Sequence, residues 1–241
     1  MTSSYPTDMT DDQWELLQTL TPPAKATGRP RTTNLRLVIN AIFYILVSGA
    51  AWRMLPHDFP PCKTVYHYFR AWRLDKTWEN IHDQFVRWER VVQGHDPSPS
   101  AGSMDSQSVK IGTLPHTDVT TGYDGGKRVK GRKRHMMVDT LGLVMMVVVT
   151  AADISDQQGA RLIFARLSAW KQRIKRMVLI WVDGTYDGVA FMKWTMDTYH
   201  WILETIKRSD NTKGFVLLPK RWVVERTWGW LNWSRRLVFR L

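Results

Sequence analysis

Three acidic residues stand beside apolar segments in a chain that is otherwise strongly basic. Asp105 lies within residues 102–109, Asp183 ends the apolar run 178–182, and Glu225 sits in a late segment rich in Trp and Val. Carboxylates placed against apolar segments are costly unless something pairs with them. Phosphoryl transfer to an external nucleophile needs charge neutralised on two oxygens, which Mg²⁺ ions held by a few carboxylates can do. The three acids therefore predict a divalent-metal site for chemistry on a phosphodiester.

The elements around these acids could bring them to one cleft. Asp105 is expected on a first strand and Asp183 at the end of a neighbouring strand, and ligands of open α/β sheets bind beyond such strand ends. Glu225 would come from a helix beside them. Helical spacing predicts one polar face that DNA or another backbone could approach, made of Arg221, Glu225, Gly229, Asn232 and Arg236.

Spacing alone leaves plainer interpretations open. An Asp at a strand end often begins a turn, and a Glu flanked by Arg on a helix is often a surface ion pair of small energy. Other aspartates compete for the same roles, namely Asp139, Asp153, Asp156, Asp187 and Asp210.

Composition favours a polyanionic partner. The 241 residues carry 34 Lys and Arg against 22 Asp and Glu, for a net charge of +12. A membrane surface is the alternative partner, but no apolar run reaches the ~20 residues of a spanning helix. The first residues lack the pattern of a signal peptide. The single Cys62 excludes an intramolecular disulfide and a zinc site built from a Cys cluster, so we expect a reducing, cytoplasmic setting. We expect no membrane partner.

Residues 1–92 are expected to form an all-helical domain that resembles a helix-turn-helix module. Helical spacing and the capping residue Thr10 predict helices near residues 10–20, 35–49, 63–73 and 76–92. A basic arm, residues 25–31, separates the first two. The polar, Pro-rich residues 93–101 are expected to be a linker.

Residues 102–241 are expected to form a second, α/β domain. Strands are predicted near residues 103–109, 134–139, 143–150, 178–182 and 201–207, with a basic loop over 122–133. Helices are predicted from a cap at Ser155 or Asp156, near 187–198, and around Glu225. This order predicts a mixed sheet flanked by helices.

Basic side chains gather in two segments that could contact DNA phosphates or enter a groove. The arm and the third helix contribute Arg29, Arg31, Lys63, Tyr66, Arg70 and Arg73. The loop contributes Lys127, Arg128, Lys130, Arg132, Lys133 and Arg134, and its contacts would depend strongly on salt. A solvated helical face is the alternative for the first segment, and a nuclear localisation signal is the alternative for the second.

Five segments in this order resemble the insertion-sequence transposases of the "five" family: Met104–Lys110, Gly131–His135, Val138–Gly142, Val182–Asp187 and Arg221–Thr227. The resemblance implies a ribonuclease-H-like catalytic domain with an Asp-Asp-Glu triad and Mg²⁺ or Mn²⁺. By position, the triad would be Asp105, Asp183 and Glu225, all three both catalytic and metal-binding.

The resemblance also implies DNA-contacting residues after the second aspartate. Arg221 matches the arginine of the signature around the glutamate helix. The signature's later basic residue is replaced by Asn232, with Arg235 and Arg236 close behind, and its usual tyrosine is replaced by Leu218. Family members continue beyond the position of Leu241, so we expect a truncated C-terminus.

The function implied is that of a DNA transposase. It would bind the ends of a mobile element, cut a strand to free a 3′-OH, and transfer that end into target DNA, as a homo-oligomer on double-stranded DNA in the bacterial nucleoid. Two alternatives stay open: a catalytically dead, truncated copy that binds DNA and represses, and a general metal-dependent nuclease on the same scaffold.

Overall fold

The computed structural model describes residues 5–24, 26–28, 30–110, 121–170, 173–206 and 220–239. Contacts divide the chain into two compact units, Met1–Trp88 with Trp233–Arg240, and Glu89–Asn232 with Leu241. The predicted site residue Arg29 and the competing Asp210 lie outside the described residues, as does Leu218. The predicted division into residues 1–92, 93–101 and 102–241 stays a prediction.

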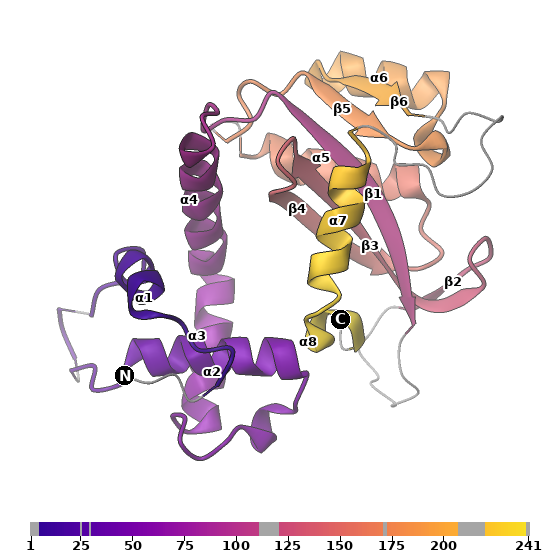
Figure 1. The fold of residues 1–241 in the computed structure, drawn as a ribbon. Coiled ribbons are helices and arrows are strands. Elements are labelled where there is room, and N and C mark those ends of the chain that lie inside the picture. The colour runs from indigo at the N-terminus through magenta and orange to yellow at the C-terminus, as the bar shows by residue number, and fades with distance from the viewer. Residues whose placement is uncertain are drawn as a thin grey trace. The chain divides into compact units, whose positions relative to one another are not determined.

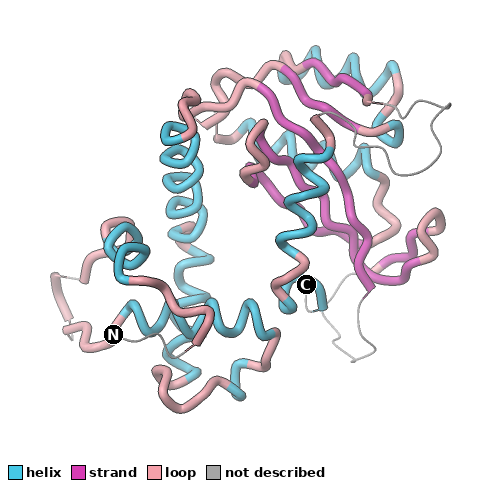
Figure 2. Tube along the Cα trace, in the orientation of Figure 1, coloured by secondary structure: helices cyan, strands magenta, loops and turns pink. Residues whose placement is uncertain are grey.

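The first unit is built from helices in its described part, as predicted (Figure 2). Thr10 begins α1 with a capping box to Gln13, and Asn34 caps α2. Gly49, at φ +70°, ends α2 in the left-handed conformation that glycine adopts at low cost. The elements are α1 Asp11–Gln18, α2 Leu35–Ser48, η1 Trp52–Met54, α3 Cys62–Leu74, most of α4 Thr77–Val92, and α8 Arg235–Phe239.

Helix α2 is the centre of this unit. Its apolar side chains are buried on several sides, among them Val38, Ile39 and Ile42, and they pack against Val65 and Trp72 of α3. A helix that is apolar around most of its surface is expected to be central in this way. The predicted helix spacing of residues 35–49 is therefore confirmed.

The second unit holds a mixed sheet with the order β2-β3-β1-β5-β6, and β4 pairs with β3 (Figure 1). Strands β1 and β3, β2 and β3, and β3 and β4 are antiparallel, whereas β1–β5 and β5–β6 are parallel. The strands are β1 Ala101–Lys110, β2 Gly122–Asp124, β3 Val129–Asp139, β4 Val144–Ala151, β5 Leu179–Val182 and β6 Ile202–Thr205. The predicted mixed α/β sheet flanked by helices is confirmed.

Helices cover both faces of this sheet. Met104 and Ile180 point to the face covered by α5 Asp156–Ser168 and α6 Val189–Tyr199, where they join Phe164 in one core. Met136 and Val138 point to the opposite face, covered by α7 Trp222–Leu231. Because successive side chains of a strand alternate between faces, Asp105 faces α7 and its neighbour Ser106 faces α5.

The predicted basic loop over residues 122–133 is wrong. The segment is a hairpin, in which β3 begins at Val129 and pairs with β1 through the register Lys110↔Gly131 to Gly102↔Asp139. The turn is closed by the Asp124 carboxylate, which accepts from the Lys127 N–H, and Arg128 takes φ +53°. Lys and Arg disfavour a strand assignment in sequence, but long-range pairing overrides that weak preference.

The predicted five-residue polar face on the glutamate helix is also wrong beyond Gly229. Helix α7 ends at Leu231, with Asn232 as its C-cap, and Arg236 lies on α8 in the other unit. The Arg134 guanidinium donates to the Asn232 side-chain oxygen at 3.0 Å and holds it at the helix end. Only Arg221, Glu225 and Gly229 keep the predicted spacing.

Candidate active site

Asp105 is positioned by β1 and by the helix packed over it. The Trp228 indole N–H of α7 donates to Asp105 Oδ2 at 3.1 Å. Helix α7 is anchored at the β3–β4 turn, where Thr227 donates to the Gly142 carbonyl at 2.8 Å and Arg226 donates to the Leu141 carbonyl at 2.6 Å. One face of the sheet therefore carries both the first predicted aspartate and the helix of the predicted glutamate.

Asp183 directly follows β5 and begins the short helix η2 Gly184–Tyr186. Its Oδ1 accepts from the Thr185 backbone N–H at 2.8 Å and from the Thr185 hydroxyl. Asp183 therefore begins a turn at the end of a strand, as the plainer interpretation of this residue predicts. The other carboxylate oxygen, Oδ2, points to Arg221.

Arg221 joins the second aspartate to the glutamate. Its Nη2 lies 3.8 Å from Asp183 Oδ2 and 3.8 Å from Glu225 Oε1. Because both distances end at the same nitrogen atom, Asp183 Oδ2 and Glu225 Oε1 lie less than twice 3.8 Å apart. Glu225 keeps 46% of its side chain exposed, whereas Arg221 keeps 15%. The Arg–Glu pair foreseen as a surface ion pair is present, but its arginine also reaches a carboxylate from a different strand.

Asp105 belongs to the same electrostatic neighbourhood. Burial, with a smaller contribution from the Asp183 carboxylate, raises the pKa of Asp105 to about 6, although the Ser106 N–H, Arg221 and Lys127 each act to lower it. Part of its surface stays accessible, although protein atoms surround it densely. All three predicted triad members therefore lie within reach of one positive group, and Asp105 is short of compensating charge.

The donor set suits a divalent cation in type and charge. Carboxylate oxygens are the ligands that Mg²⁺ prefers, and a buried carboxylate with a raised pKa gains most from a nearby cation. Within the described residues, no group of three or more His, Cys, Asp or Glu side chains is close enough to enclose a metal ion. In this arrangement the Arg221 guanidinium supplies the positive charge between the acids.

The raised pKa of Asp105 predicts a measurable stability effect in metal-free protein. The folded state holds this proton up to about pH 6 and the unfolded chain only to the ordinary value of 3.8, so stability falls as pH rises across that interval. We expect Asp105→Asn to be more stable than the original protein above pH 6, by about 1–3 kcal/mol. Denaturant unfolding in EDTA at several pH values measures this, and a difference that persists unchanged at pH 3.5 contradicts it.

The competing aspartates occupy other environments. Asp139 is fully buried, pairs with Arg90, and accepts the N–H groups of Leu141 and Leu143 at 2.9 Å each. Asp153 and Asp187 are exposed. Its buried ion pair and its two backbone hydrogen bonds give Asp139 a structural role.

Asp156 is different, because it lies beside the candidate site and was foreseen only as a possible cap or competitor. Ser155 is the cap of α5, and it forms a capping box with Gln158. Asp156 instead accepts from the Ser106 hydroxyl at 2.7 Å and lies 3.3 Å from Lys133 Nζ. No sequence spacing links it to β1, so only the packing of α5 against the sheet reveals this contact.

Tyr186 was also not foreseen. It is fully buried at the end of η2, and the pKa of its hydroxyl is raised by burial and by Asp156, Asp105 and Asp183. The hydroxyl makes no hydrogen bond of good geometry, although the Ser106 hydroxyl is close enough to lower its pKa slightly. The motif around Asp183 was the available signal, since Tyr186 belongs to it.

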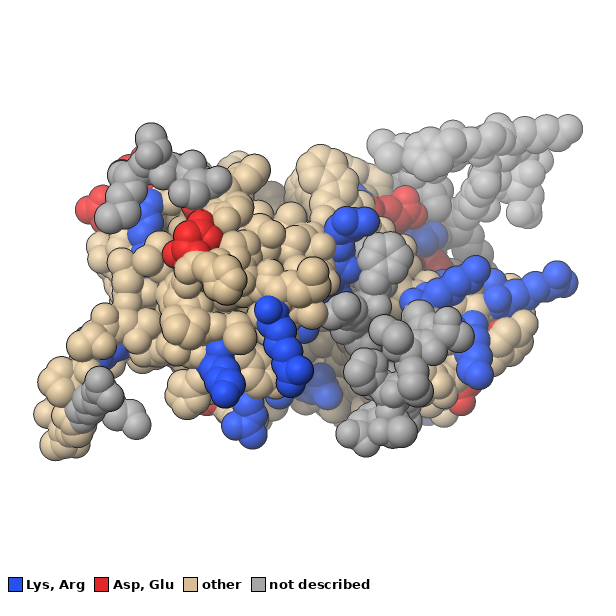
Figure 3. All heavy atoms as spheres, turned by 90° about the horizontal axis from the view of Figure 1, so that it is seen from below, with Lys and Arg blue, Asp and Glu red and all other residues tan. Residues whose placement is uncertain are grey.

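The basic residues of the hairpin divide into two groups. Lys127, Arg128 and Lys130 are exposed, and Lys and Arg side chains project over the hairpin at the right of Figure 3. Arg132 is partly buried. Lys133 is buried between carboxylates, and Arg134 is buried over the Trp228 ring, 4.7 Å from its centroid. The exposed group is open to a large polyanion, although Lys127 Nζ also donates to the Ser106 carbonyl at 3.3 Å.

The basic residues of the helical unit divide similarly. Four exposed side chains share one face of α3, at helical spacing: Lys63, Tyr66, Arg70 and Arg73. Arg31 is exposed, and its guanidinium donates to the Pro22 carbonyl. Arg235 is exposed on α8, whereas Arg236 donates to the Ala50 carbonyl at 3.0 Å and lies over the Trp52 ring. Arg236 therefore serves the packing of its own unit.

Comparison with family models shows the family to which the chain belongs. Residues 96–239 match the family described as "Transposase DDE domain". Residues 9–82 match the family described as "Putative transposase of IS4/5 family". The first match covers more than half of the chain, so the protein belongs to the DDE transposases, and the predicted family is confirmed. Membership implies a DDE-type enzyme with a general dependence on divalent metal.

Comparison with solved structures adds little. A Mos1 transposase paired-end complex with the left transposon end aligns with a TM-score of 0.29 and 10% identity, over 80% of this chain and 65% of that one. A pre-cleavage Mos1 transpososome aligns with a TM-score of 0.28 and 10% identity, over 76% and 61%. The chain thus spans less than two thirds of either, and likenesses this weak carry no argument. No curated protein matches the chain.

Hydropathy adds one observation on the described helices. Among them, none is long and apolar enough to span a bilayer. The predicted absence of a membrane partner stays a prediction.

Proposed function

We propose that the protein is a DNA transposase in which Asp105, Asp183 and Glu225 hold Mg²⁺ or Mn²⁺ for strand cleavage and 3′-OH strand transfer. The observation that carries this proposal is the position of Arg221. One guanidinium lies 3.8 Å from carboxylates of β5's end and of α7, and its charge also acts on Asp105 of β1. Acidic side chains that three distant segments bring around one arginine are suited to hold a metal ion in its place.

The chain's own residues would prepare the reaction in three ways. The Trp228 indole N–H donates to Oδ2 of Asp105 and the Thr185 N–H donates to Oδ1 of Asp183, so both carboxylates are held in place. Glu225 keeps 46% of its side chain exposed, against 23% for Asp183, and would turn from Arg221 toward a bound ion. Bound divalent ions would neutralise the developing charge and activate the attacking oxygen. Water would attack first, and the freed 3′-OH would then displace a target phosphodiester oxygen in line.

DNA contact is assigned to the two exposed basic faces. The α3 face of the helical unit suits phosphate contacts and groove entry beside the element ends. The hairpin carries Lys127, Arg128 and Lys130 within the catalytic unit. Since two element ends must be joined, the working form would be a homo-oligomer on double-stranded DNA, in the bacterial cytoplasm at the nucleoid.

Replacing the three exposed hairpin cations by alanine should weaken DNA binding at every sequence. Each phosphate contact releases counterions, so losing three contacts reduces the slope of log affinity against log salt by about 2–3. Fluorescence anisotropy with a labelled duplex across a salt series measures the slope. Alanine at Lys193, an exposed lysine of α6, provides the control. An unchanged slope in the triple variant would remove the hairpin from the DNA interface.

The test of function is a cleavage assay on DNA carrying element ends. We expect strand cleavage and joined products with Mg²⁺ or Mn²⁺ and none in EDTA. Specific binding without cleavage under all metals would instead identify a DNA-binding repressor. Cleavage without end specificity or strand transfer would identify a general nuclease.

A further inference from the structure

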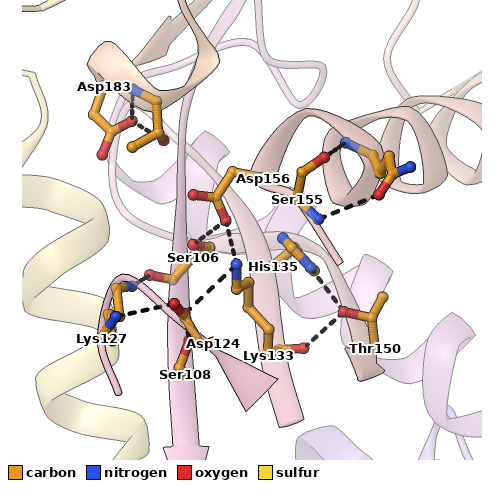
Figure 4. Close-up of polar contacts among 12 residues, drawn as sticks. Ser106, Ser108, Asp124, Lys127, Lys133, His135, Thr150, Ser155, Asp156 and Asp183 are labelled. Carbon is orange, nitrogen blue, oxygen red and sulfur yellow. Dashed lines mark hydrogen bonds and ion pairs between the residues drawn. The ribbon is translucent and has the colours of Figure 1, made fainter. Parts of the chain in front are cut away.

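The turn of the β2–β3 hairpin is fastened to β1 by polar side chains (Figure 4). The Asp124 carboxylate, only 10% exposed, accepts from the Ser108 hydroxyl of β1 at 2.5 Å and from the Lys127 backbone N–H at 3.0 Å. Asp124 Oδ2 also lies 3.6 Å from the buried ammonium group of Lys133. Because these contacts hold the turn against the strand, the backbone of Lys127 has a fixed place beside β1.

The side chain of Lys127 extends from this turn to the backbone of β1. Its Nζ donates to the Ser106 carbonyl at 3.3 Å, and Ser106 directly follows Asp105. Each residue of a strand advances it by about 3.4 Å, so the ammonium group lies about one residue along the strand from the first acid of the candidate site. The charge of Lys127 lowers the pKa of Asp105, which agrees with this position.

The Ser106 carbonyl points to the edge of β1 on which β5 lies. Ser100, just before β1, points its carbonyl to that edge, because it accepts from the Val178 N–H at 2.9 Å. Carbonyls of alternate residues point to the same edge of a strand, and β1 keeps a regular register with β3 over Gly102–Lys110. On the other edge β5 pairs only with Ala101–Ser103. Among the described strands, none therefore pairs with this edge of β1 at the position where Lys127 binds it.

The second acid of the candidate site lies at the same edge. Asp183 directly follows β5, and the parallel register pairs Ser103 with Trp181. Two further residues along both strands bring Asp105 level with Asp183. The ammonium group of Lys127 therefore lies one residue past the two acids, beyond the end of β5. Ligands of open α/β sheets bind beyond strand ends of this kind.

The ammonium group of Lys127 is open to an anion. The residue is exposed, and among the described residues its ammonium group forms no ion pair and donates only to the neutral Ser106 carbonyl. An ammonium group carries three donors, so two remain. Arg221, the other cation that acts on Asp105, is only 15% exposed and lies between two carboxylates.

We propose that Lys127 is a catalytic residue whose ammonium group binds a non-bridging oxygen of the phosphodiester that is cut. The inference rests on the proposed function, because it takes Asp105 and Asp183 as the place of cleavage. It separates Lys127 from Arg128 and Lys130, whose side chains form no hydrogen bond or ion pair with β1 in the described part of the chain. Those two would meet phosphates elsewhere on the DNA.

The chemistry of the step explains why a cation is needed there. The oxygen of water bonds to phosphorus, and the bond from phosphorus to the 3′ oxygen breaks. Water gives up a proton to solvent, and the leaving 3′ oxygen takes one up. Negative charge is spread over the non-bridging oxygens in the transition state, and a cation already placed beside one of them stabilises that state without reorganisation.

The first experiment is single-turnover cleavage of element-end DNA over a range of DNA concentrations, which separates the maximal rate from the affinity. We expect Lys127→Ala to lower the maximal rate about 10²–10³-fold, the usual effect of removing one such donor. Lys127→Arg keeps the charge and should recover part of the rate. Lys193→Ala removes an exposed lysine of α6 and should cut normally.

The second experiment measures binding without cleavage, with Ca²⁺ in place of Mg²⁺, to duplexes that carry a neutral methylphosphonate at the position to be cut. The original chain should bind this duplex about tenfold more weakly than the natural one, since a charged hydrogen bond is lost. Lys127→Ala should bind both duplexes alike, because the two changes remove the same contact. Lys130→Ala removes the same charge from the same hairpin, and its loss should add to that of the methylphosphonate.

Two results would overturn the inference. One is a maximal rate of Lys127→Ala within about tenfold of the original, since a donor to the reacting group is worth more than that. The other is a methylphosphonate effect in Lys127→Ala as large as in the original chain. Denaturant unfolding confirms that the variant is folded, as its exposed position leads us to expect.

The two failures are distinguishable. If the original chain cuts element ends and Asp183→Asn does not, either result removes Lys127 from the reaction and leaves the proposed function standing. If the original chain cuts no element-end DNA with Mg²⁺ or Mn²⁺, the proposed function fails and this inference with it.

Discussion

Asp183→Asn is expected to lower metal-dependent strand cleavage by roughly a thousandfold, a loss of about 4 kcal/mol of transition-state stabilisation. The amide keeps the size of the carboxylate and can still accept from Thr185. It removes the negative charge that Arg221 faces in this structure and that a divalent ion would face in the reaction. The loss should therefore appear in chemistry and leave the fold intact.

The measurement is single-turnover cleavage of element-end DNA, with binding affinity determined in parallel. Glu225→Gln should show a loss of the same order, since its carboxylate shares the same arginine. Asp197→Asn, at an exposed position on α6, is the matched control and should cut normally. Residual cleavage within tenfold of the original in either triad variant would show that the acids are not the catalytic set.

The second large effect concerns stability. Asp139→Ala should reduce the free energy of unfolding of the second unit by about 3–5 kcal/mol, the usual cost of leaving one member of a buried ion pair alone. Arg90 is only 4% exposed and would lose its partner. The N–H groups of Leu141 and Leu143 would also lose their acceptor, which opens the β3–β4 turn on which α7 is anchored.

Denaturant unfolding, followed separately for the two units, measures this effect. Arg90→Met should cost a similar amount, and the double variant Arg90→Met with Asp139→Ala should cost clearly less than the two single losses together. Additive losses would mean that the pair is not energetically coupled.

Sequence patterns were sufficient for most of the elements. Thr10, Asn34 and Ser155 are caps whose side-chain oxygens satisfy the first N–H groups of their helices, and this local chemistry is legible in sequence. The apolar run before Asp183 is a buried parallel strand, as such runs tend to be. The hairpin at residues 122–133 escaped detection, because its basic composition hid strands that are stabilised by pairing with β1.

By itself, the amino-acid sequence determined the family, the class of fold and the three acids worth testing, because these depend on residue types and local spacing. Only the tertiary structure decided which charged side chains are exposed to solvent. It buried Lys133 and Arg134, left Lys127, Arg128 and Lys130 exposed, and placed Asp156 of α5 against Ser106 of β1. The physical reason is that burial and long-range contact depend on how α5 and α7 pack on opposite faces of one sheet, and no local pattern encodes that arrangement.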